Sequence, residues 1–527
     1  QKLKALAINL SKNQRKIYIP NSIDNPMSYD VIFILGERFC DHPLCGVAIL
    51  KRLLEKNKYS VGIIEVPKTE EDINKLGKPN LFFGVSSGSI DSMLRNYTAL
   101  KKKREAKEVL NYKQEVPDRA VIVYSNWIRK SFKDSLIVIG GIESSFRRFT
   151  HYDYWQNSLR KSIIFDSRAD ILVYGYGEKQ CLEIAKRMSN KEALFGIDGT
   201  CIRSREVPKG FIELPSHEEV LNSKEKFCDM QNLFDNNKNL SQKTGNFYIL
   251  QYKFPKYSST DLDEYYGFAF TRKVSMDYLK GFEFSVVTHR GCIGNCNFCS
   301  LRLMSSGKII SRSEESILKE VRYLTRLPHF KGNIDDLGGP SANMYGMDCD
   351  LCGKDCIDCK KLDRSHLRII HLLRQIKKVK GVKNVYVRSG VRYDLANDEY
   401  LKELKYHISG KLKIAPEHVS PNVLEMMNKN KGDLDDFIRR FKKLGCGELA
   451  FYFMVAHPGS TMKDARELAD KIKKLKNTES IQIFTPTPMT VSTCMYYTGL
   501  NPKTKKPIYV PQTYQDKKDQ RRVLGLR

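Results

Sequence analysis

Short apolar runs alternate with amphipathic stretches over the first third of the chain. The run from Val31 to Gly36 is wholly apolar and ends in glycine, as strands buried on both faces of a parallel sheet do. Apolar residues at helical spacing follow it, between Val47 and Leu54. The same pattern predicts further strands at 61–64, 81–85, 121–124, 136–141 and 171–175. We therefore expect an α/β, doubly wound parallel-sheet domain over 29–185, with its ligand crevice at the carboxyl ends of the strands.

A second alternation of strands and helices occupies the later part of the chain. Apolar and β-branched runs followed by helical patterns predict six strands, at 282–288, 332–337, 382–388, 411–415, 448–455 and 480–484. Six such units predict a partial (β/α)6 barrel over 256–500, whose active site lies at the carboxyl ends of its strands.

The remaining segments have no clear apolar period. Residues 1–28 are expected to be an extension, and 501–527 a basic tail. Residues 186–255 are expected to be a polar connector between the two domains, with 235–239 as its least foldable part.

Three cysteines lie on the loop that leaves the first predicted barrel strand. Cys292, Cys296 and Cys299 have the spacing C-x3-C-x2-C, on a turn loosened by Gly291 and Gly294. Three thiolates can hold three irons of a cubane [4Fe-4S] cluster and leave the fourth iron open, whereas electron-transfer clusters use four cysteines. The alternatives are three core cysteines, or a zinc site completed by His289.

This loop resembles that of the radical S-adenosylmethionine (SAM) enzymes, in which an aromatic residue, here Phe298, precedes the last cysteine. The resemblance implies that the open iron chelates the amino and carboxylate groups of SAM. It also implies that the reduced cluster cleaves SAM to methionine and a 5′-deoxyadenosyl radical.

Several polar or glycine residues end the predicted barrel strands. Gly338 and Gly339 follow strand two, where radical SAM enzymes commonly have a glycine pair near the SAM amino group, and glycine allows close approach of backbone carbonyls. Arg388 and Ser389 close strand three, and Glu417 closes strand four. In this barrel such residues usually face SAM or substrate, and a structural salt bridge is the alternative.

A second group of cysteines lies in a predicted insertion at 345–362. Cys349, Cys352, Cys356 and Cys359 could bind zinc or a second iron–sulfur cluster. Their two pairs are separated by only three residues, against about 15–20 in common zinc ribbons. Free thiols are the alternative.

The sheet domain is of the kind that binds cobalamin in many radical SAM enzymes. Their signature is Asp-x-His-x-x-Gly, with the histidine approaching cobalt, whereas Asp41 and His42 are adjacent here. We therefore expect no cobalamin.

Longer stretches closely resemble the YgiQ-like radical SAM family. They include 36–43, 76–84, 140–145, 151–155, 336–345, 415–418 and 495–499, within a resemblance that extends from Tyr29 to Arg522. The resemblance implies a three-cysteine [4Fe-4S] cluster, SAM and a cysteine-rich insertion after strand two, but no particular substrate.

Composition limits the compartment and the partners. The 527 residues, 41% of them hydrophobic and 28% charged, suit two or three soluble domains, and no apolar run is long enough to span a membrane. Fourteen cysteines, seven of them between Cys292 and Cys359, favour metal binding in a reducing, cytoplasmic compartment. The net charge of +28 makes RNA a candidate partner, with basic residues scattered over solvated faces as the alternative.

We therefore predict a radical SAM enzyme that acts on an unknown small-molecule or macromolecular substrate and receives electrons from a one-electron reductant such as flavodoxin or ferredoxin. The alternatives are a cobalamin-dependent or RNA-modifying methyl- or methylthiotransferase, and a non-catalytic iron–sulfur or zinc protein that binds nucleic acid.

Overall fold

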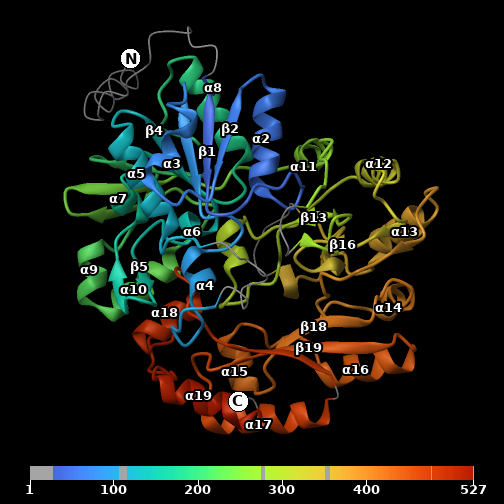
Figure 1. Cartoon of the computed structure of the whole chain (residues 1–527). Helices are drawn as coiled ribbons and strands as arrows, with labels where there is room; N and C mark the ends of the chain where they lie inside the picture. Colours follow the sequence, from blue (N-terminus) through green and yellow to red (C-terminus); the bar gives the residue numbers. More distant parts are fainter. Residues whose placement is uncertain (1–27, 106–114, 275–278, 350–355, 476, 526–527) are drawn as a thin grey trace.

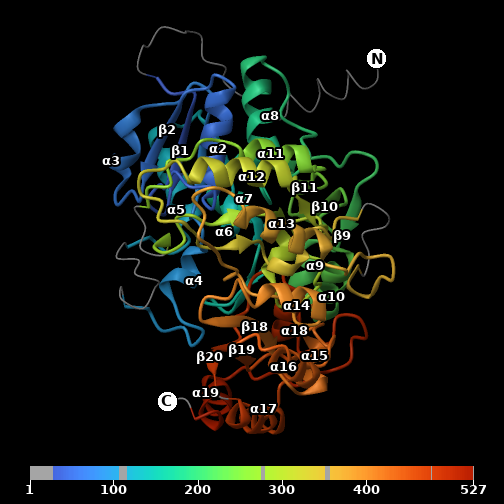
Figure 2. The same cartoon turned by 90° about the vertical axis from the view of Figure 1, so that its right-hand side faces the viewer.

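A computed structural model describes residues 28–105, 115–274, 279–349, 356–475 and 477–525 of the chain. Figure 1 shows a large sheet at the top of the view and the strands of a second region below and beside it. Figure 2 shows the same arrangement from the side, with the C-terminal helices at the bottom, far from the sheet.

The large sheet has nine strands in the order β2-β1-β3-β4-β7-β8-β11-β10-β9. Its first five strands are parallel and confirm the predicted doubly wound domain. Because side chains alternate along each strand, Val31 and Phe33 join the core under α2 and α8, whereas Ile32 and Ile34 join the core under α5. The strands are β1 (Val31–Leu35), β2 (Val61–Glu65), β3 (Phe82–Ser86), β4 (Leu136–Ile139) and β7 (Ile171–Val173), and the longer helices α2 (Gly46–Lys56), α5 (Ala120–Ser131) and α8 (Glu178–Ser189).

One predicted strand is wrong, because residues 121–124 lie in α5. Val121, Tyr124, Ser125 and Ile128 are buried at helical spacing, so the β-branched run belongs to one face of a helix. Packing of that face on the sheet outweighs the local strand preference. The shorter elements of this region are α3 (Glu70–Ile73), α4 (Ser92–Asn96), α6 (Gly141–Ser145), α7 (Ile163–Ser167) and the hairpin β5 (His151–Asp153) and β6 (Ser158–Arg160).

The segment expected to be a polar connector contributes four strands to the same sheet. Polar residues of these strands are not necessarily exposed to water, because Gln242 and Gln251 are fully buried and hydrogen-bonded. Asn236, within the part expected to be least foldable, is buried as well. The elements are β8 (Thr200–Ser204), β9 (Ile212–Leu214), β10 (Leu240–Thr244), β11 (Phe247–Gln251), α9 (His217–Asn222) and α10 (Lys224–Leu233), and α11 (Ser259–Tyr266) follows this segment.

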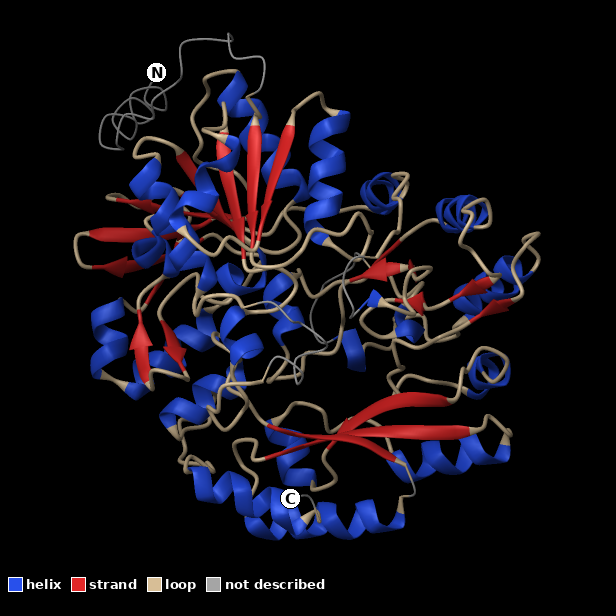
Figure 3. Ribbon diagram, viewed as in Figure 1, coloured by secondary structure: helices blue, strands red, loops and turns tan. Residues whose placement is uncertain are grey.

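The barrel region has the predicted order of strands and helices, but its strands form several short ladders (Figure 3). All paired barrel strands except the β13–β14 hairpin are parallel. The strands are β12 (Val286–Val287), β13 (His289–Arg290), β14 (Ile310–Ser311), β15 (Asn333–Ile334), β16 (Leu337–Gly338), β17 (Asn384–Val385), β18 (Lys411–Glu417), β19 (Glu448–Val455) and β20 (Thr478–Ile483). The helices are α12 (Glu314–Leu324), α13 (Leu367–Lys377), α14 (Asp398–Leu404), α15 (Pro421–Met426), α16 (Leu434–Lys443), α17 (Met462–Lys474) and α18 (Val491–Thr498).

The segment expected to be a basic tail contains a helix that packs on the barrel. This helix, α19 (Tyr514–Val523), lies against α17, and Gln520 accepts a hydrogen bond from the backbone N–H of Ala456. Lys517 on the same helix is buried. Across the described residues, no helix combines the length and the apolar character needed to cross a membrane.

Candidate active site

The cysteine loop leaves β13 at the carboxyl ends of the first barrel strands. Gly291, at the start of this loop, has a φ of +87° that side chains rarely adopt, and a Cβ placed there would lie 1.8 Å from the Lys308 carbonyl oxygen. The loop can therefore turn closely against the chain that follows it only because this residue is glycine.

The three thiols are largely shielded from water. Cys296 is buried, and Cys292 and Cys299 are partly exposed. Burial raises the pKa of Cys299 to about 12 and also raises the pKa of Cys292. Among the described residues, no three His, Cys, Asp or Glu side chains lie close enough together to hold a metal ion, so the three thiols share one loop without forming a finished ligand set.

Two hydrogen-bond donors nevertheless point at the sulfur atoms. The Gly294 N–H donates to Cys292 Sγ at 3.3 Å, and Arg392 Nη1 lies 3.6 Å from Cys296 Sγ. Asp394 holds this guanidinium by accepting from its Nε at 3.0 Å. At Cys292, the Gly294 N–H and the charge of Arg392 act against the effect of burial and favour the thiolate, which is the form that binds iron.

The glycine pair lies directly beside the strand that carries the cysteine loop. Thr288 N–H donates to the Gly338 carbonyl at 2.8 Å. A Cβ on Gly339 would lie 2.6 Å from the ring of His289, and a Cβ on Gly338 would lie 2.3 Å from Ser389 Oγ. The structure therefore brings strands one, two and three together at this edge, as the sequence predicts.

The other predicted strand-end residues have structural partners. Ser389 and the backbone N–H of Arg388 donate to the Asp336 carboxylate, and Arg388 Nη1 donates to the Gly281 carbonyl at 3.0 Å. Glu417 forms an ion pair with Lys429 at 3.4 Å, and burial raises the pKa of its carboxyl group.

Sequence reasoning did not identify Arg392 and Lys429 as site residues. Lys429 Nζ lies 5.9 Å from the centre of the Phe298 ring, so it reaches the cysteine loop from the segment after α15. Both residues come from segments more than ninety positions away along the chain, and a single sequence carries no signal for that proximity.

His289, the residue that would complete the alternative zinc site, packs against the glycine pair. It is fully buried, and burial lowers the pKa of its ring to about 4. Its Nδ1 lies 2.9 Å from Thr288 Oγ1 and its ring covers Gly339. A neutral histidine packed in this way is part of the wall of the site.

Two cysteines of the second group, Cys356 and Cys359, lie near the cysteine loop. Cys356 and Cys359 are partly buried and pack with Cys292 against a small apolar cluster that includes Ile293 and Leu362. Cys349 is partly exposed, and Cys352 falls outside the described residues.

A cavity of about 500 Å³ opens beside the cysteine loop. Cys296, Asn297 and Cys299 form one wall, and Met495 of α18 forms part of another. This volume is within the range of roughly 300–1,000 Å³ that small-molecule sites occupy. A molecule bound in this cavity would lie next to Cys296 and Cys299.

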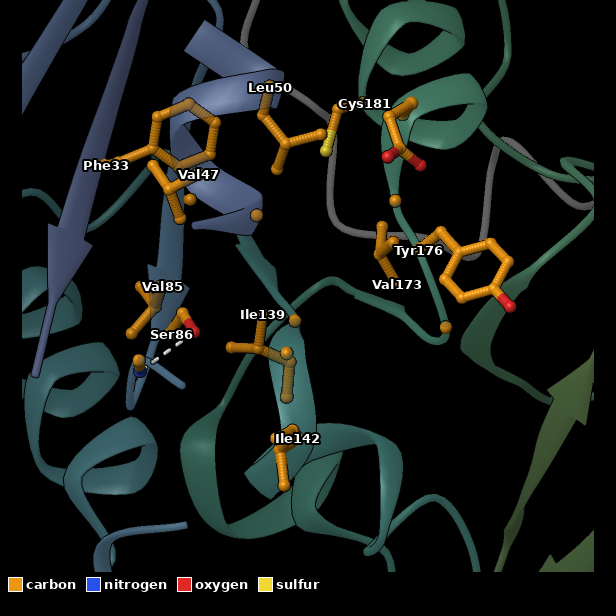
Figure 4. Close-up of a pocket in the computed structure, with 18 of the residues that line it drawn as sticks. Phe33, Val47, Leu50, Val85, Ser86, Ile139, Ile142, Val173, Tyr176 and Cys181 are labelled. Carbon is orange, nitrogen blue, oxygen red and sulfur yellow. Dashed lines mark hydrogen bonds between the residues drawn. The ribbon is translucent and has the colours of Figure 1, made fainter. Parts of the chain in front are cut away.

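A second cavity, of about 320 Å³, lies at the carboxyl ends of the sheet strands. Figure 4 shows Val85, Ser86, Ile139 and Val173 approaching it from three parallel strands, and Tyr176 from the segment that follows the last of these. Its position next to β1 and β3 is the switch point where ligands bind in such sheets.

His42 does not face this second cavity. The Leu44 N–H donates to its Nδ1 at 3.1 Å, and its Nε2 lies 3.0 Å from the Glu283 carbonyl. Both ring nitrogens are therefore occupied, and burial lowers the pKa of the ring to about 4. The histidine joins the sheet domain to the barrel.

A cysteine loop and a glycine pair at the open edge of a partial barrel, next to a doubly wound sheet, are the features expected of a radical SAM enzyme. The family descriptions agree, since residues 23–287 match the radical SAM N-terminal domain and residues 286–472 the radical SAM superfamily domain. The chain belongs to the UPF0313 family, which is the YgiQ family. It is 45% identical to a member from Methanocaldococcus jannaschii (94% of this chain, 89% of that protein) and 41% identical to one from Fusobacterium nucleatum (94% and 96%).

The fold is also that of a solved radical SAM methyltransferase. TsrM from Kitasatospora setae, determined with cobalamin and a [4Fe-4S] cluster bound, superposes with a TM-score of 0.53 over 89% of this chain and 77% of that one. The two sequences are 15% identical, so this likeness concerns the fold. These comparisons confirm the predicted fold class and the predicted enzyme class.

Replacement of Gly291 by Ala should disturb the cysteine loop. Its Cβ would overlap a backbone carbonyl that cannot turn away, so we expect a lower thermal midpoint and a several-fold loss of iron per chain. The matched control is Gly307→Ala, at a φ of +78° with open space around the added Cβ. This change should lower the free energy of unfolding by only roughly 1–2 kcal/mol, the cost of a left-handed backbone at alanine. Equal iron contents in the two variants would contradict this account of the loop.

Proposed function

We propose that Cys292, Cys296 and Cys299 hold the [4Fe-4S] cluster of this radical SAM enzyme. The observation that carries the proposal is the convergence of the cysteine loop, the glycine pair and Arg392 at one end of the barrel. The donors fit the group, because two of the three sulfurs have a hydrogen-bond donor, and Cys296 is buried while Cys292 and Cys299 are only partly exposed. When bound and reduced, the cluster supplies the electron that cleaves SAM into methionine and a 5′-deoxyadenosyl radical.

The residues around the loop would bind and orient SAM. The Gly339 carbonyl would accept a hydrogen bond from its ammonium group. Gly338 would hold this strand end in place, because its own carbonyl already accepts from Thr288. Ser389 and Glu417 are the proposed contacts to its polar groups at neighbouring strand ends. Arg388 would join them only when its guanidinium leaves the Gly281 carbonyl.

The substrate is proposed to enter the cavity beside Cys296 and Cys299. Its walls combine amide side chains, such as Asn297 and Asn428, with methionines, so it suits a substrate with both polar and apolar parts. Closure of this cavity by the substrate would exclude water from a radical reaction.

Each cluster cysteine should be essential for a SAM-responsive cluster. Changing any one to Ala removes one of the three thiolates that the loop supplies. Electron paramagnetic resonance of the reduced protein should lose the signal that SAM perturbs, and 5′-deoxyadenosine release should fall by at least about 100-fold. The matched control is Cys446→Ala, a buried barrel cysteine whose thiol donates to the Leu401 carbonyl. A SAM-sensitive signal in all three variants would overturn the assignment.

We also propose that Cys349, Cys352, Cys356 and Cys359 bind a second metal centre, zinc or iron–sulfur. The support is the packing of Cys356 and Cys359 around a small apolar cluster, in an insertion with few other buried residues. A metal would add folding free energy there and keep the thiols deprotonated.

Metal content separates a second centre from free thiols. A Cys292/Cys296/Cys299→Ala triple variant, purified without oxygen, should retain about one zinc or one intact cluster per chain. The metal should disappear when the four insertion cysteines are also changed. A triple variant that contains neither zinc nor iron would show that the insertion carries free thiols.

The fold resembles that of a cobalamin-binding enzyme, but the local geometry does not favour cobalamin binding. TsrM binds it on a similar fold, yet neither nitrogen of His42 is free to bind cobalt in this chain. The cavity of about 320 Å³ at the sheet edge is also small for a corrinoid. The residues present do not fit a histidine-ligated cobalamin, and we propose that none is bound.

Protein produced with hydroxocobalamin supplied should therefore elute from gel filtration without the visible corrinoid band. A stoichiometric corrinoid would contradict the proposal. Its spectrum would then tell whether histidine is coordinated, and His42→Ala would test that ligand directly.

The reaction partners follow from the class of enzyme. A one-electron donor such as flavodoxin or ferredoxin is the proposed reductant. The comparisons give no support for RNA as a partner. The cytoplasmic location, like the choice between a methyl- or methylthiotransferase and another radical reaction, stays a prediction from the sequence.

A further inference from the structure

The two densest basic runs of the chain meet at one cavity. Lys101 belongs to the run at 101–104 and Lys517 to the basic C-terminal segment, and both line a cavity of about 530 Å³. The other walls come from β5, from α18 and from the residues just before α19. With Lys224 of α10, five parts of the chain that are distant in sequence therefore build this space.

Lys517 is the unusual residue of the cavity. It is 2% exposed, and among the described residues no carboxylate forms an ion pair with it. Its Nζ donates to Tyr154 Oη at 2.7 Å and to Tyr496 Oη at 2.8 Å. A buried ammonium group without a counter-ion is costly, so lysine is rarely found in such a place.

The two tyrosines are arranged to accept from this amine. The Tyr154 hydroxyl donates its own proton to the Ala99 carbonyl at 2.6 Å, and the Tyr496 hydroxyl donates to the Gln512 carbonyl at 3.4 Å. Each hydroxyl oxygen is then an acceptor for Lys517. An ammonium group has three protons, and these bonds use two of them. The third is available to a group that enters the cavity.

The surroundings of Lys517 are positive and aromatic. Lys101 Nζ and Lys517 Nζ both lie 4.6 Å from the centre of the Tyr154 ring, and Lys224 lines the same cavity. Further tyrosine rings, those of Tyr152, Tyr497 and Tyr514, contribute to the walls. Lysines act as point charges that suit phosphate, and flat aromatic faces suit a planar ring.

We propose that this cavity binds a small molecule that carries both a phosphate group and an aromatic ring, with the phosphate on Lys517. The phosphate would be the missing counter-ion of Lys517, and the ring would lie against the tyrosines. This site is separate from the cavity beside the cysteine loop, since the two share no lining residue. The proposal therefore stands independently of the cluster and of SAM.

The protonation of Lys517 gives the site a defined pH dependence. Burial, and then the positive charge of Lys101, lower the pKa of Lys517 to about 7, while Asp516 on its own helix raises it slightly. The pKa of Tyr154 is raised to about 12 and that of Tyr496 is raised further by burial, so neither ring titrates near neutrality. A bound anion favours charged Lys517, so affinity should fall as pH rises above about 7.

Adenosine monophosphate, adenosine and sulfate are suitable probes for calorimetry with the full chain. The monophosphate should bind saturably at about 1 mM or below, and adenosine and sulfate should each bind at least about tenfold more weakly. Sulfate keeps its charge over this range, so its affinity should fall by up to tenfold per pH unit above about pH 7. Binding of sulfate as tightly as the monophosphate would overturn the aromatic part of the proposal.

Lys517→Met should abolish binding of the monophosphate and the pH dependence for sulfate. The matched control, Lys518→Met, removes the same charge one position away, outside the cavity lining, and should change affinity less than twofold. Lys101→Met separates the contribution of the second lysine. It should weaken binding and move the pH dependence to higher pH, because the charge of Lys101 lowers the pKa of Lys517. Unchanged affinity in Lys517→Met, or no saturable binding of the monophosphate at millimolar concentration, would overturn the proposal.

A second measurement does not depend on how the variants fold. Competitive acetylation of the wild-type chain should show Lys517 as reactive at neutral pH once the reagent enters the cavity. The monophosphate should protect it, whereas adenosine should not. Equal labelling of Lys517 with and without the monophosphate would contradict occupancy of this cavity.

Discussion

The placement of the cysteine loop against the sheet depends on one buried cation, Arg148. Its guanidinium donates to Gln251 of β11, to Asn236 and to the carbonyl of Leu303, just after the cysteine loop. No carboxylate is among these partners, and the group lies over the ring of Tyr174 at 4.1 Å. Because these partners are uncharged, neutral acceptors and a ring face stabilise the charge of the guanidinium. Burial lowers its pKa. A single side chain thus connects the sheet, its antiparallel extension and the start of the barrel.

This arrangement explains why the first domain does not end where the apolar runs end. The strands β8 to β11 supply polar side chains that Arg148 and the backbone near Thr150 require, such as Gln242 and Gln251. Asn236 adds to the same junction by donating to the carbonyls of Arg302 and Ser305. The sheet and the barrel are therefore joined by satisfied buried hydrogen bonds, which are costly to break one at a time.

The sequence predicted most reliably what depends on local pattern. Apolar runs bounded by glycine identified the parallel strands, and cysteine spacing identified the loop. It failed at 121–124, where three β-branched residues and a tyrosine belong to a helix. It also treated polarity as exposure, and so missed the strands around Gln242 and the burial of Lys517. Arg392 and Lys429 could not be predicted, because their positions follow from the order of strands in space.

Helix α18 lies between two of the cavities. Met495 lines the cavity beside the cysteine loop, whereas Tyr496 and Tyr497 line the cavity around Lys517. Any shift of this eight-residue helix changes both spaces at once. If occupancy of one cavity favours a particular position of the helix, the free energy of that preference is shared by both sites. A molecule in the cavity around Lys517 that tightens binding beside the cysteine loop must then itself bind more tightly when the cavity beside the loop is filled.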